Sequence, residues 1–292
     1  MPSANERQSG VITGLDHLVL VCPEILSGAA VYEKLLGRKA DWRAEVEGGG
    51  ASALFRLGNT SLELLAPAGE GPLAERLAEM IEADGPGLKT LAFGSDGLKA
   101  DHATFTRRGL QPEPITDGQS THAQTGAARA WQRFRIPDAK TGGIKVFVIE
   151  PGEGAPEAIP AEADAVHGLD HAVINTAAPD RALAFYGAKL GLRLALDRTN
   201  PDWGVRLIFF RTGGLTIEIA QRLADPEDHT KPDSFWGLTW AVADITAAHQ
   251  RLGASGFDVS EIRKGRKPGS RVFTVRDGTM NVPTLFIAHE AV

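Results

Sequence analysis

The sequence predicts an α+β protein built from four βαβββ modules, arranged as two tandem halves of similar plan. Two observations carry this prediction. Short segments recur in the same order in both halves, and each half combines helices with groups of short apolar strands. The length of 292 residues agrees, because it corresponds to about two domains of ordinary size.

The repeat begins with Gly-Leu-Asp-His at residues 14–17, which recurs at residues 168–171. Further matches follow in order, and their offsets drift slightly, as insertions and deletions in loops would produce. They pair Tyr32 with Tyr186, Gly37 with Gly191, Glu63 with Glu218, and His102 with His249. Ordered matches of this kind indicate a duplicated chain.

A segment at residues 151–165 separates the two copies. It is rich in Pro, Ala, Glu and Gly and has no apolar periodicity, which is typical of a linker. We therefore expect an N-terminal domain over residues 11–150 and a C-terminal domain over residues 166–290.

The first module of each half follows from local patterns. Residues 17–22 form a short apolar run that predicts a strand, and residues 25–36 show helical spacing that ends at Gly37. Three more strands are expected at 39–45, 51–57 and 60–66. The corresponding elements of the third module are a strand at 169–175, a helix at 179–189, and strands at 193–198, 205–211 and 215–221.

The second and fourth modules begin with strands at 88–94 and 236–243, followed by helices at 98–107 and 244–253. The polar segments at 117–129 and 263–270 are expected to be long loops. The final strands of both halves are correspondingly harder to delimit.

Bulk properties narrow the class of protein. A net charge of −6 and a pI of about 5.8 argue against a nucleic-acid partner, which requires a basic surface. The single cysteine, Cys22, excludes an internal disulfide and fits a reducing compartment. No apolar run is long enough to span a membrane, and residues 1–10 lack the core of a signal peptide. We expect a cytoplasmic protein.

Four βαβββ modules in series, with Gly-Leu-Asp-His before an apolar strand and Leu-Glu-Leu or Ile-Glu-Ile in a later one, resemble the vicinal oxygen chelate superfamily. That superfamily includes glyoxalases, bleomycin resistance proteins and extradiol dioxygenases. The resemblance covers residues 12–290 and implies two glyoxalase-like half-barrels. In each, two modules curl their sheets into a cup that holds a metal, and helices cover the outside.

The resemblance also implies metal ligands, a His in the first strand of a module and a Glu in its last. Carried over to this sequence, they are His17 and Glu63 in the first module and His171 and Glu218 in the third. Imidazole and carboxylate are good ligands for Fe, Mn, Ni, Co or Zn. A carboxylate within an apolar strand is costly to bury unless it is paired, which favours a role for both glutamates.

The other two modules depart from this pattern. Thr90 and Gly237 occupy the histidine positions, and the last strands carry Lys145, Phe147, Thr284 and Phe286 where a carboxylate is expected. Modules paired in sequence order would leave each cup two ligands, whereas pairing the first with the third would unite all four. Two alternatives therefore remain, a bound divalent metal, or His and Glu residues that hydrogen-bond the substrate or each other.

Candidate substrate-binding residues lie in the second half. The basic segment at 263–276 is either a clamp for an anion or a solvated loop, and Arg271 and Arg276 are its better candidates as ligands. Arg211 lies at the rim of the third module. Trp203 is either a pocket wall or, as we favour, part of the core.

The leading hypothesis is a metal-dependent lyase or isomerase that acts on a small oxygen-rich, anionic substrate, with Glu63 and Glu218 as catalytic residues that move protons. A ring-cleaving dioxygenase ranks lower, because Gly237 replaces a histidine that such enzymes use. A metal-free protein that binds and sequesters a small molecule is the second hypothesis. A third is that only the second half is functional, which its Arg and Trp residues favour slightly. A homodimer would cover exposed sheet edges.

Overall fold

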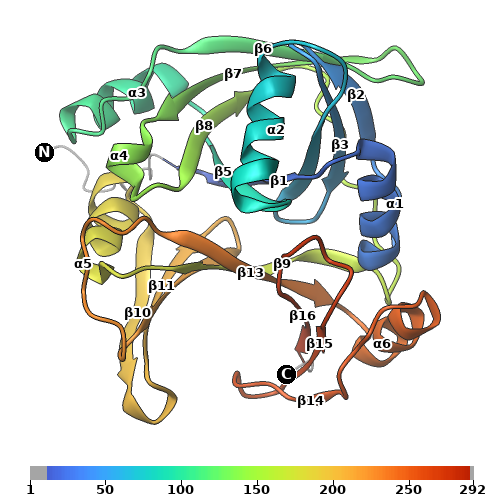
Figure 1. The fold of residues 1–292 in the computed structure, drawn as a ribbon, viewed down its shortest axis with the longest axis vertical. Helices are drawn as coiled ribbons and strands as arrows, with labels where there is room; N and C mark the ends of the chain where they lie inside the picture. The colour runs from blue at the N-terminus through green and yellow to red at the C-terminus, as the bar shows by residue number, and fades with distance from the viewer. Residues whose placement is uncertain (1–11, 290–292) are drawn as a thin grey trace, which may run out of the picture.

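The computed structural model describes residues 12–289 and contains two eight-stranded mixed sheets, one in each half of the chain (Figure 1). The first sheet runs from Gly14 to Pro151 and the second from Val166 to His289. The predictions for residues 1–10, and the predicted domain ends at residues 11 and 290, lie outside the described residues. Within residues 12–289, no helix is long and apolar enough to cross a membrane.

The first half contains two βαβββ modules with two additional helices. Its elements are β1 (Gly14–Val21), α1 (Ile25–Leu36), β2 (Trp42–Val46), β3 (Gly50–Arg56), β4 (Ser61–Pro67), α2 (Pro72–Asp84), β5 (Gly87–Gly94), α3 (Leu98–Arg107), β6 (Thr116–Thr121), β7 (Ala128–Ile136), α4 (Asp138–Thr141) and β8 (Lys145–Pro151).

The second half repeats the plan. Its elements are β9 (Val166–Asn175), α5 (Pro179–Ala182), which continues as a π-helix (Leu183–Lys189), β10 (Arg193–Asn200), a short 3₁₀ turn (Pro201–Trp203), β11 (Val205–Thr212), β12 (Leu215–Arg222), β13 (Ser234–Val242), α6 (Ile245–Ala254), β14 (Arg263–Lys264), β15 (Ser270–Val275) and β16 (Thr284–His289).

The predicted order of four βαβββ modules is confirmed, and two local expectations change. The segment at 117–129, expected to be a loop, contains most of β6 and the start of β7, which pair with each other. The helix α2 was not anticipated. Its first turn contains Pro72, and it has no counterpart between β12 and β13.

Strand order settles which modules share a sheet. The first sheet runs β2-β3-β4-β1-β5-β8-β7-β6, so β1 and β5 join the first two modules, and β9 and β13 join the last two in the same way. The first and third modules therefore do not form a common cup. The two sheets lie back to back; the second cup is open on the side away from the first, whereas the edge strands β2 and β6 of the first sheet meet, so that this sheet nearly closes into a barrel (Figure 1).

Residue alternation in β1 explains how one strand serves both the core and the cup. Leu18 and Leu20 are fully buried in the core, whereas His17 and Val19 line the hollow of the first cup. Glu24 caps the N-terminus of α1, because its carboxylate accepts hydrogen bonds from the N–H groups of Leu26 and Ser27.

A single hydrophobic core connects the two halves. Tyr32 of α1 is fully buried and donates a hydrogen bond to the carbonyl oxygen of Thr279, at 3.2 Å. Asn59 bridges the halves as well, because its amide donates to the Leu169 carbonyl at 2.8 Å and accepts from the Leu169 N–H at 3.0 Å. The halves therefore present two cups on one rigidly packed body.

The cups differ in how they are covered. In the first half, α2 lies across the hollow, and its Leu73, Leu77 and Met80 line it together with strand residues (Figure 1). At the edge of this sheet, the Trp42 indole donates a hydrogen bond to the Ser120 hydroxyl at 2.8 Å, which ties β2 to β6. The first cup is therefore roofed, whereas the second lacks a roof helix.

Candidate functional site

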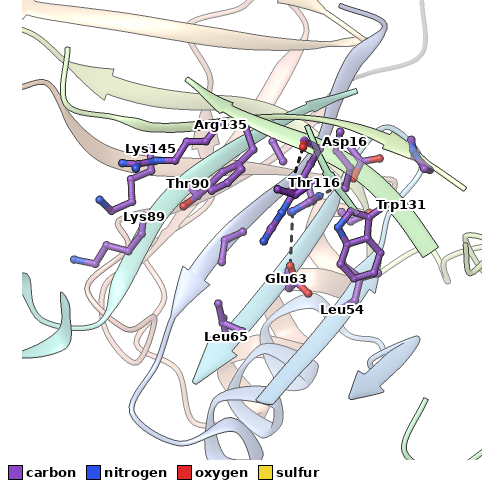
Figure 2. A pocket seen from close by; sticks show the side chains of 18 of the residues that line it. Asp16, Leu54, Glu63, Leu65, Lys89, Thr90, Thr116, Trp131, Arg135 and Lys145 are labelled. Atoms are coloured by element: carbon purple, nitrogen blue, oxygen red, sulfur yellow. Dashed lines mark hydrogen bonds and ion pairs between the residues drawn. The ribbon is translucent and has the colours of Figure 1, made fainter. Parts of the chain in front are cut away.

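The first cup encloses a cavity of about 730 Å³ (Figure 2). Residues of β1, β3, β4, β5, β6, β7 and β8 form its walls, and α2 covers it. Its volume is in the range that accommodates a small organic molecule. Its lining includes the predicted residues His17 and Glu63.

His17 is held between two carboxylates in this cavity. Its Nδ1 lies 2.6 Å from Asp16 Oδ1, and its Nε2 lies 3.7 Å from Glu63 Oε2. Because an ionised carboxylate only accepts hydrogen bonds, Nδ1 carries the proton in the neutral imidazole. The lone pair of Nε2 then faces Glu63 and the cavity.

Glu63 is fixed by a cation. Arg129 Nη2 lies 3.4 Å from Glu63 Oε1, and the Arg129 guanidinium lies against the rings of Trp42 and Trp131, with distances of 5.4 and 5.0 Å to the ring centroids. The glutamate therefore remains partnered without a bound metal.

Asp16 is the orienting partner of His17. Burial would raise its pKa, but the hydrogen bond from His17 and the nearby charges of Arg56 and Arg129 outweigh burial and hold the pKa below its usual value. Asp16 therefore stays ionised and keeps the proton of His17 on Nδ1.

Strand register identifies the positions equivalent to His17 and Glu63 in the second module. His17 pairs with Ala92 and Val19 pairs with Thr90, so the approximate two-fold relation between β1 and β5 makes Thr90 the equivalent of His17. Glu63 pairs with Val19, and Phe147 pairs with Ala92, so Phe147 is the equivalent of Glu63. The departures expected at Thr90 and Phe147 thus fall at the ligand positions.

The donor set does not fit a resident divalent metal. Catalytic metal sites generally use three protein ligands, whereas this cup offers His17 Nε2 and Glu63, with Thr90 and Phe147 at the remaining positions. Across residues 12–289, no group of three or more His, Cys, Asp or Glu side chains is arranged to hold a metal ion.

Cations dominate the polar lining of the cavity. Three carboxylates line it, Asp16, Glu63 and Glu113. The cationic side chains that line it are Arg56, Arg76, Lys89, Arg129, Arg133, Arg135 and Lys145. Lys89, Arg135 and Lys145 gather at one side of the cavity (Figure 2). This surplus of positive charge suits an anionic ligand.

The second cup contains the same pair in a different setting. His171 Nδ1 lies 2.6 Å from Asp170, and His171 Nε2 lies 3.7 Å from Glu218, as in the first cup. Here, however, Thr239 Oγ1 lies 2.9 Å from His171 Nε2. With the proton on Nδ1, the Thr239 hydroxyl donates to Nε2 and occupies its lone pair.

Further groups engage the second cup. Lys267 Nζ and His289 Nε2 lie 2.5 and 3.0 Å from Asp170, and together with His171 they lower the pKa of Asp170 despite its burial. Burial is the largest influence on Glu218 and raises its pKa. Both ring nitrogens of His171 are thus already engaged by groups of the chain itself.

Equivalent positions in the fourth module also follow from register. Gly237 pairs with Val173 and is the equivalent of His171, as expected. Leu285 pairs with Thr239 and is the equivalent of Glu218. Thr284 and Phe286, the residues expected there, are buried on the other face of β16, because a shift of one residue along a strand reverses the side-chain direction.

The predicted substrate-binding residues lie in the second half, outside the cavity of the first cup. The expectation that Trp203 belongs to the core is wrong, because this residue is 49% exposed. The Arg266 guanidinium lies 4.0 Å from the centroid of the Trp203 ring. Arg276 forms an ion pair with Asp258 at 2.7 Å, and Arg211 and Arg271 are exposed. In the basic segment, Lys267 is the residue that reaches Asp170.

Several residues of the first cup were not selected from the sequence. Arg129, Trp131 and Arg133 lie in β7, where alternate residues face the cavity. The alternation of residues 129–135 could have predicted that these side chains face a cavity. The loop expected at 117–129 overlaps the start of β7, so the strand was not predicted. Arg76 lies on α2, the helix that was not anticipated.

Two family models match the chain. Residues 15–186 match the model described as "Glyoxalase-like domain", and residues 168–282 match that described as "Glyoxalase/Bleomycin resistance protein/Dioxygenase superfamily". The two matches together cover both halves, as the predicted resemblance requires. No curated protein matches the sequence.

Solved structures of similar fold cover nearly the whole chain. A mutant of 4-hydroxymandelate synthase from Streptomyces coelicolor has a TM-score of 0.65 at 14% identity, over 96% of this chain and 94% of that chain. The Mn(II)-bound glyoxalase from Novosphingobium aromaticivorans has a TM-score of 0.61 at 13% identity, over 95% of this chain and 82% of that chain. At such identities the likeness establishes the two-domain fold and leaves the reaction open.

Proposed function

Since the chain belongs to the glyoxalase-like domain family, within the two-domain vicinal oxygen chelate superfamily, we propose that it is a lyase or isomerase that moves a proton on a small, oxygen-rich, anionic substrate. One observation carries the proposal. The Nε2 lone pair of His17 faces Glu63 inside a cation-lined cavity, while Asp16 holds the other ring nitrogen.

The proposed step is general base catalysis by His17. Nε2 takes a proton from a carbon next to a substrate carbonyl, and the electrons of the broken C–H bond move to form an enolate. Glu63, at 3.7 Å from Nε2, and Asp16 stabilise the imidazolium that forms. Return of the proton to a neighbouring carbon completes an isomerisation, and departure of a group from that carbon completes an elimination.

Positive charge supports this step. An enolate oxygen that develops in the cavity is stabilised by guanidinium groups already held in place, because fixed charges need no reorganisation during the reaction. Arg129 is such a group, since Glu63 and two tryptophan rings restrain it. Arg129 therefore both orients Glu63 and supplies positive charge to the cavity.

The donor set of the cup leads us to assign no step to a divalent metal. Removal of divalent ions from the purified protein with a chelator is therefore expected to leave the rate of proton transfer unchanged. Loss of activity on chelation, with recovery on addition of Fe, Mn, Ni, Co or Zn, would instead support the metal-dependent form of this chemistry.

The test is exchange of α-protons for deuterium in D₂O, followed by NMR. A panel of α-keto acids, hemithioacetals and acyl-CoA compounds covers the proposed substrate class. We expect exchange with at least one compound, and we expect His17→Asn and Glu63→Gln to slow it by about 10²- to 10⁴-fold, the usual contribution of a general base.

The duplication supplies matched controls. His171→Asn and Glu218→Gln remove the same atoms from the second cup and are expected to leave exchange unchanged. Equal losses from both pairs of variants would contradict the assignment to the first cup. Binding of a compound without any exchange or turnover would support a sequestering protein, and oxygen uptake with catechols would support a ring-cleaving dioxygenase.

A further inference from the structure

The helix that roofs the first cup carries an unusual charge distribution. Arg76 is the single cationic residue of α2, whose other charged residues are Glu75, Glu79, Glu82 and Asp84. None of these four acids lines the cavity, whereas Arg76 does. The one positive charge of the helix therefore borders the ligand space, on a side chain that is itself exposed to solvent.

Arg133 of β7 is a second cation of this kind. Its guanidinium lies 5.0 Å from the ring centroid of Phe147 and lines the same cavity. Surrounding protein lowers its pKa, and the positive charge of Arg76 lowers it further, while Glu63 opposes this effect. The charge of Arg76 thus acts on Arg133, and both side chains line the same cavity.

Neither arginine is neutralised by the protein. Among residues 12–289, no carboxylate forms an ion pair with Arg76 or Arg133. By contrast, Lys89 pairs with Asp84, Arg135 with Glu113 and Asp138, and Lys145 with Asp138. Both side chains are exposed to solvent at the cavity, so their charges are solvated and their N–H donors remain available to a bound anion.

We propose that Arg76 and Arg133 form an anion-binding subsite that holds a dianionic group of the ligand, a dicarboxylate or a phosphate, between the roof helix and strand β7. Guanidinium groups suit this role, because their planar N–H donors match the oxygens of carboxylates and phosphates in pairs. The placement of the reacting end of the ligand at His17 rests on the proposed function, whereas anion binding itself does not.

The subsite also assigns a role to α2. A helix that contributes one of two anion ligands closes the cavity more firmly once the anion is bound. The apolar residues Leu73, Leu77 and Met80 of the same helix then cover the remainder of the ligand. The subsite has no counterpart in the second half, which lacks a helix between β12 and β13.

The test is calorimetric titration of the full chain with malonate, inorganic phosphate and acetate. We expect a dianion to bind more tightly than acetate, and Arg76→Gln and Arg133→Gln each to weaken it by about tenfold or more, the effect of losing a charge-assisted contact. The relative affinity for malonate and phosphate identifies the source of the dianion. Arg107→Gln, on the exposed surface of α3, is the matched control and should bind as the unaltered protein does.

Two further variants separate this inference from the proposed function. Glu63→Gln removes a negative charge beside the subsite and should bind the dianion equally or more tightly, even though it slows proton exchange. Equal affinity in Arg76→Gln, Arg133→Gln and the unaltered protein, with the folded state of each confirmed by thermal unfolding, would overturn the subsite. So would the absence of dianion binding, whatever the exchange assay shows.

Discussion

Each cup contains a His–Glu pair in which Nε2 and Oε2 lie 3.7 Å apart. The residues beside the two pairs differ, and this difference decides whether the histidine Nε2 is free to interact with a ligand. In the first cup, His17 pairs across β1 and β5 with Ala92, which offers no hydrogen-bonding side chain. In the second, Thr239 occupies that place and binds His171 Nε2. The His–Glu pair is present in both halves of the duplicated chain, and the residue opposite the histidine decides whether the Nε2 lone pair is free.

The coverings of the cups differ as well. The first cup has α2 as a roof and encloses a cavity of about 730 Å³, whereas the second has Lys267 and His289 bound to Asp170. A buried, oriented base needs a space that excludes bulk water and admits a ligand. The comparison therefore favours the first cup as the site of chemistry.

The largest predicted effect concerns the roof. Leu77 is 1% exposed and packs on the inner side of α2, so Leu77→Ala should lower the free energy of unfolding by about 2–5 kcal/mol through lost burial and a new void. Leu223→Ala, at a residue 41% exposed just after β12, should change it by less than about 0.5 kcal/mol. Denaturant unfolding measures both, and equal effects would show that the roof is not a packed element.

The second prediction concerns Ala92 and Thr239, the residues that differ beside the two histidines. Ala92→Thr should place a hydroxyl within reach of His17 Nε2, as Thr239 is placed at His171. Proton exchange should then slow by about tenfold, since the base must give up a hydrogen bond before it accepts a proton. Ala92→Val has a similar shape without a hydroxyl and is the control. If Thr and Val slow exchange equally, the effect is steric and the proposed role of Thr239 fails.

The smallest effect compares the two first helices. Glu33 of α1 is 13% exposed and accepts from Lys39 and Arg43 at 2.7 Å, whereas Gly187 occupies the equivalent place in the second half. Burial alone would raise the pKa of Glu33, but hydrogen bonds from Lys39, Arg43 and the Ala40 N–H outweigh it and lower the pKa. The ionised form is therefore favoured by folding.

Glu33→Gln should accordingly destabilise the protein by about 1 kcal/mol at pH 7. Because the pKa is lowered on folding, this contribution is fully present above the ordinary pKa, near 4.5, and is lost as the pH falls from there through the lowered pKa of the folded state. Unfolding curves at pH 7 and pH 3.5 measure the difference. Glu79→Gln, an exposed position on α2, should show no such pH dependence, and a constant deficit in Glu33→Gln would contradict this account.

The module plan was predictable because it rests on local pattern. The helix at residues 25–36 was predicted correctly, because its apolar spacing is visible in the sequence and a glycine follows it. This residue, Gly37, adopts the left-handed conformation that ends the helix. In contrast, β6 has the polar sequence TDGQST and becomes a strand through pairing with β7. Tertiary pairing of this kind overrides local preference.

The sequence pattern could predict which residues of neighbouring strands share the concave face of the cup. His17 and Glu63 were expected on one concave face, and both line the cavity. The contacts of Thr239 and the absence of any at Ala92 depend on the register between β1 and β5 and between β9 and β13, which contains bulges in both sheets. Sequence pattern does not fix bulge positions, so it could not distinguish the two cups.

The most direct test of the central claim, that the first cup receives the ligand, uses the tryptophan side chains as reporters. Trp131 lines the cavity of the first cup, and Trp203 and Trp236 are exposed in the second half. Their indole N–H signals can be assigned by single Trp→Phe variants and followed by NMR during titration with malonate or phosphate. The account predicts that the Trp131 signal moves while those of Trp203 and Trp236 stay fixed. Movement of the latter two with Trp131 unchanged would place the ligand in the second cup and contradict the account.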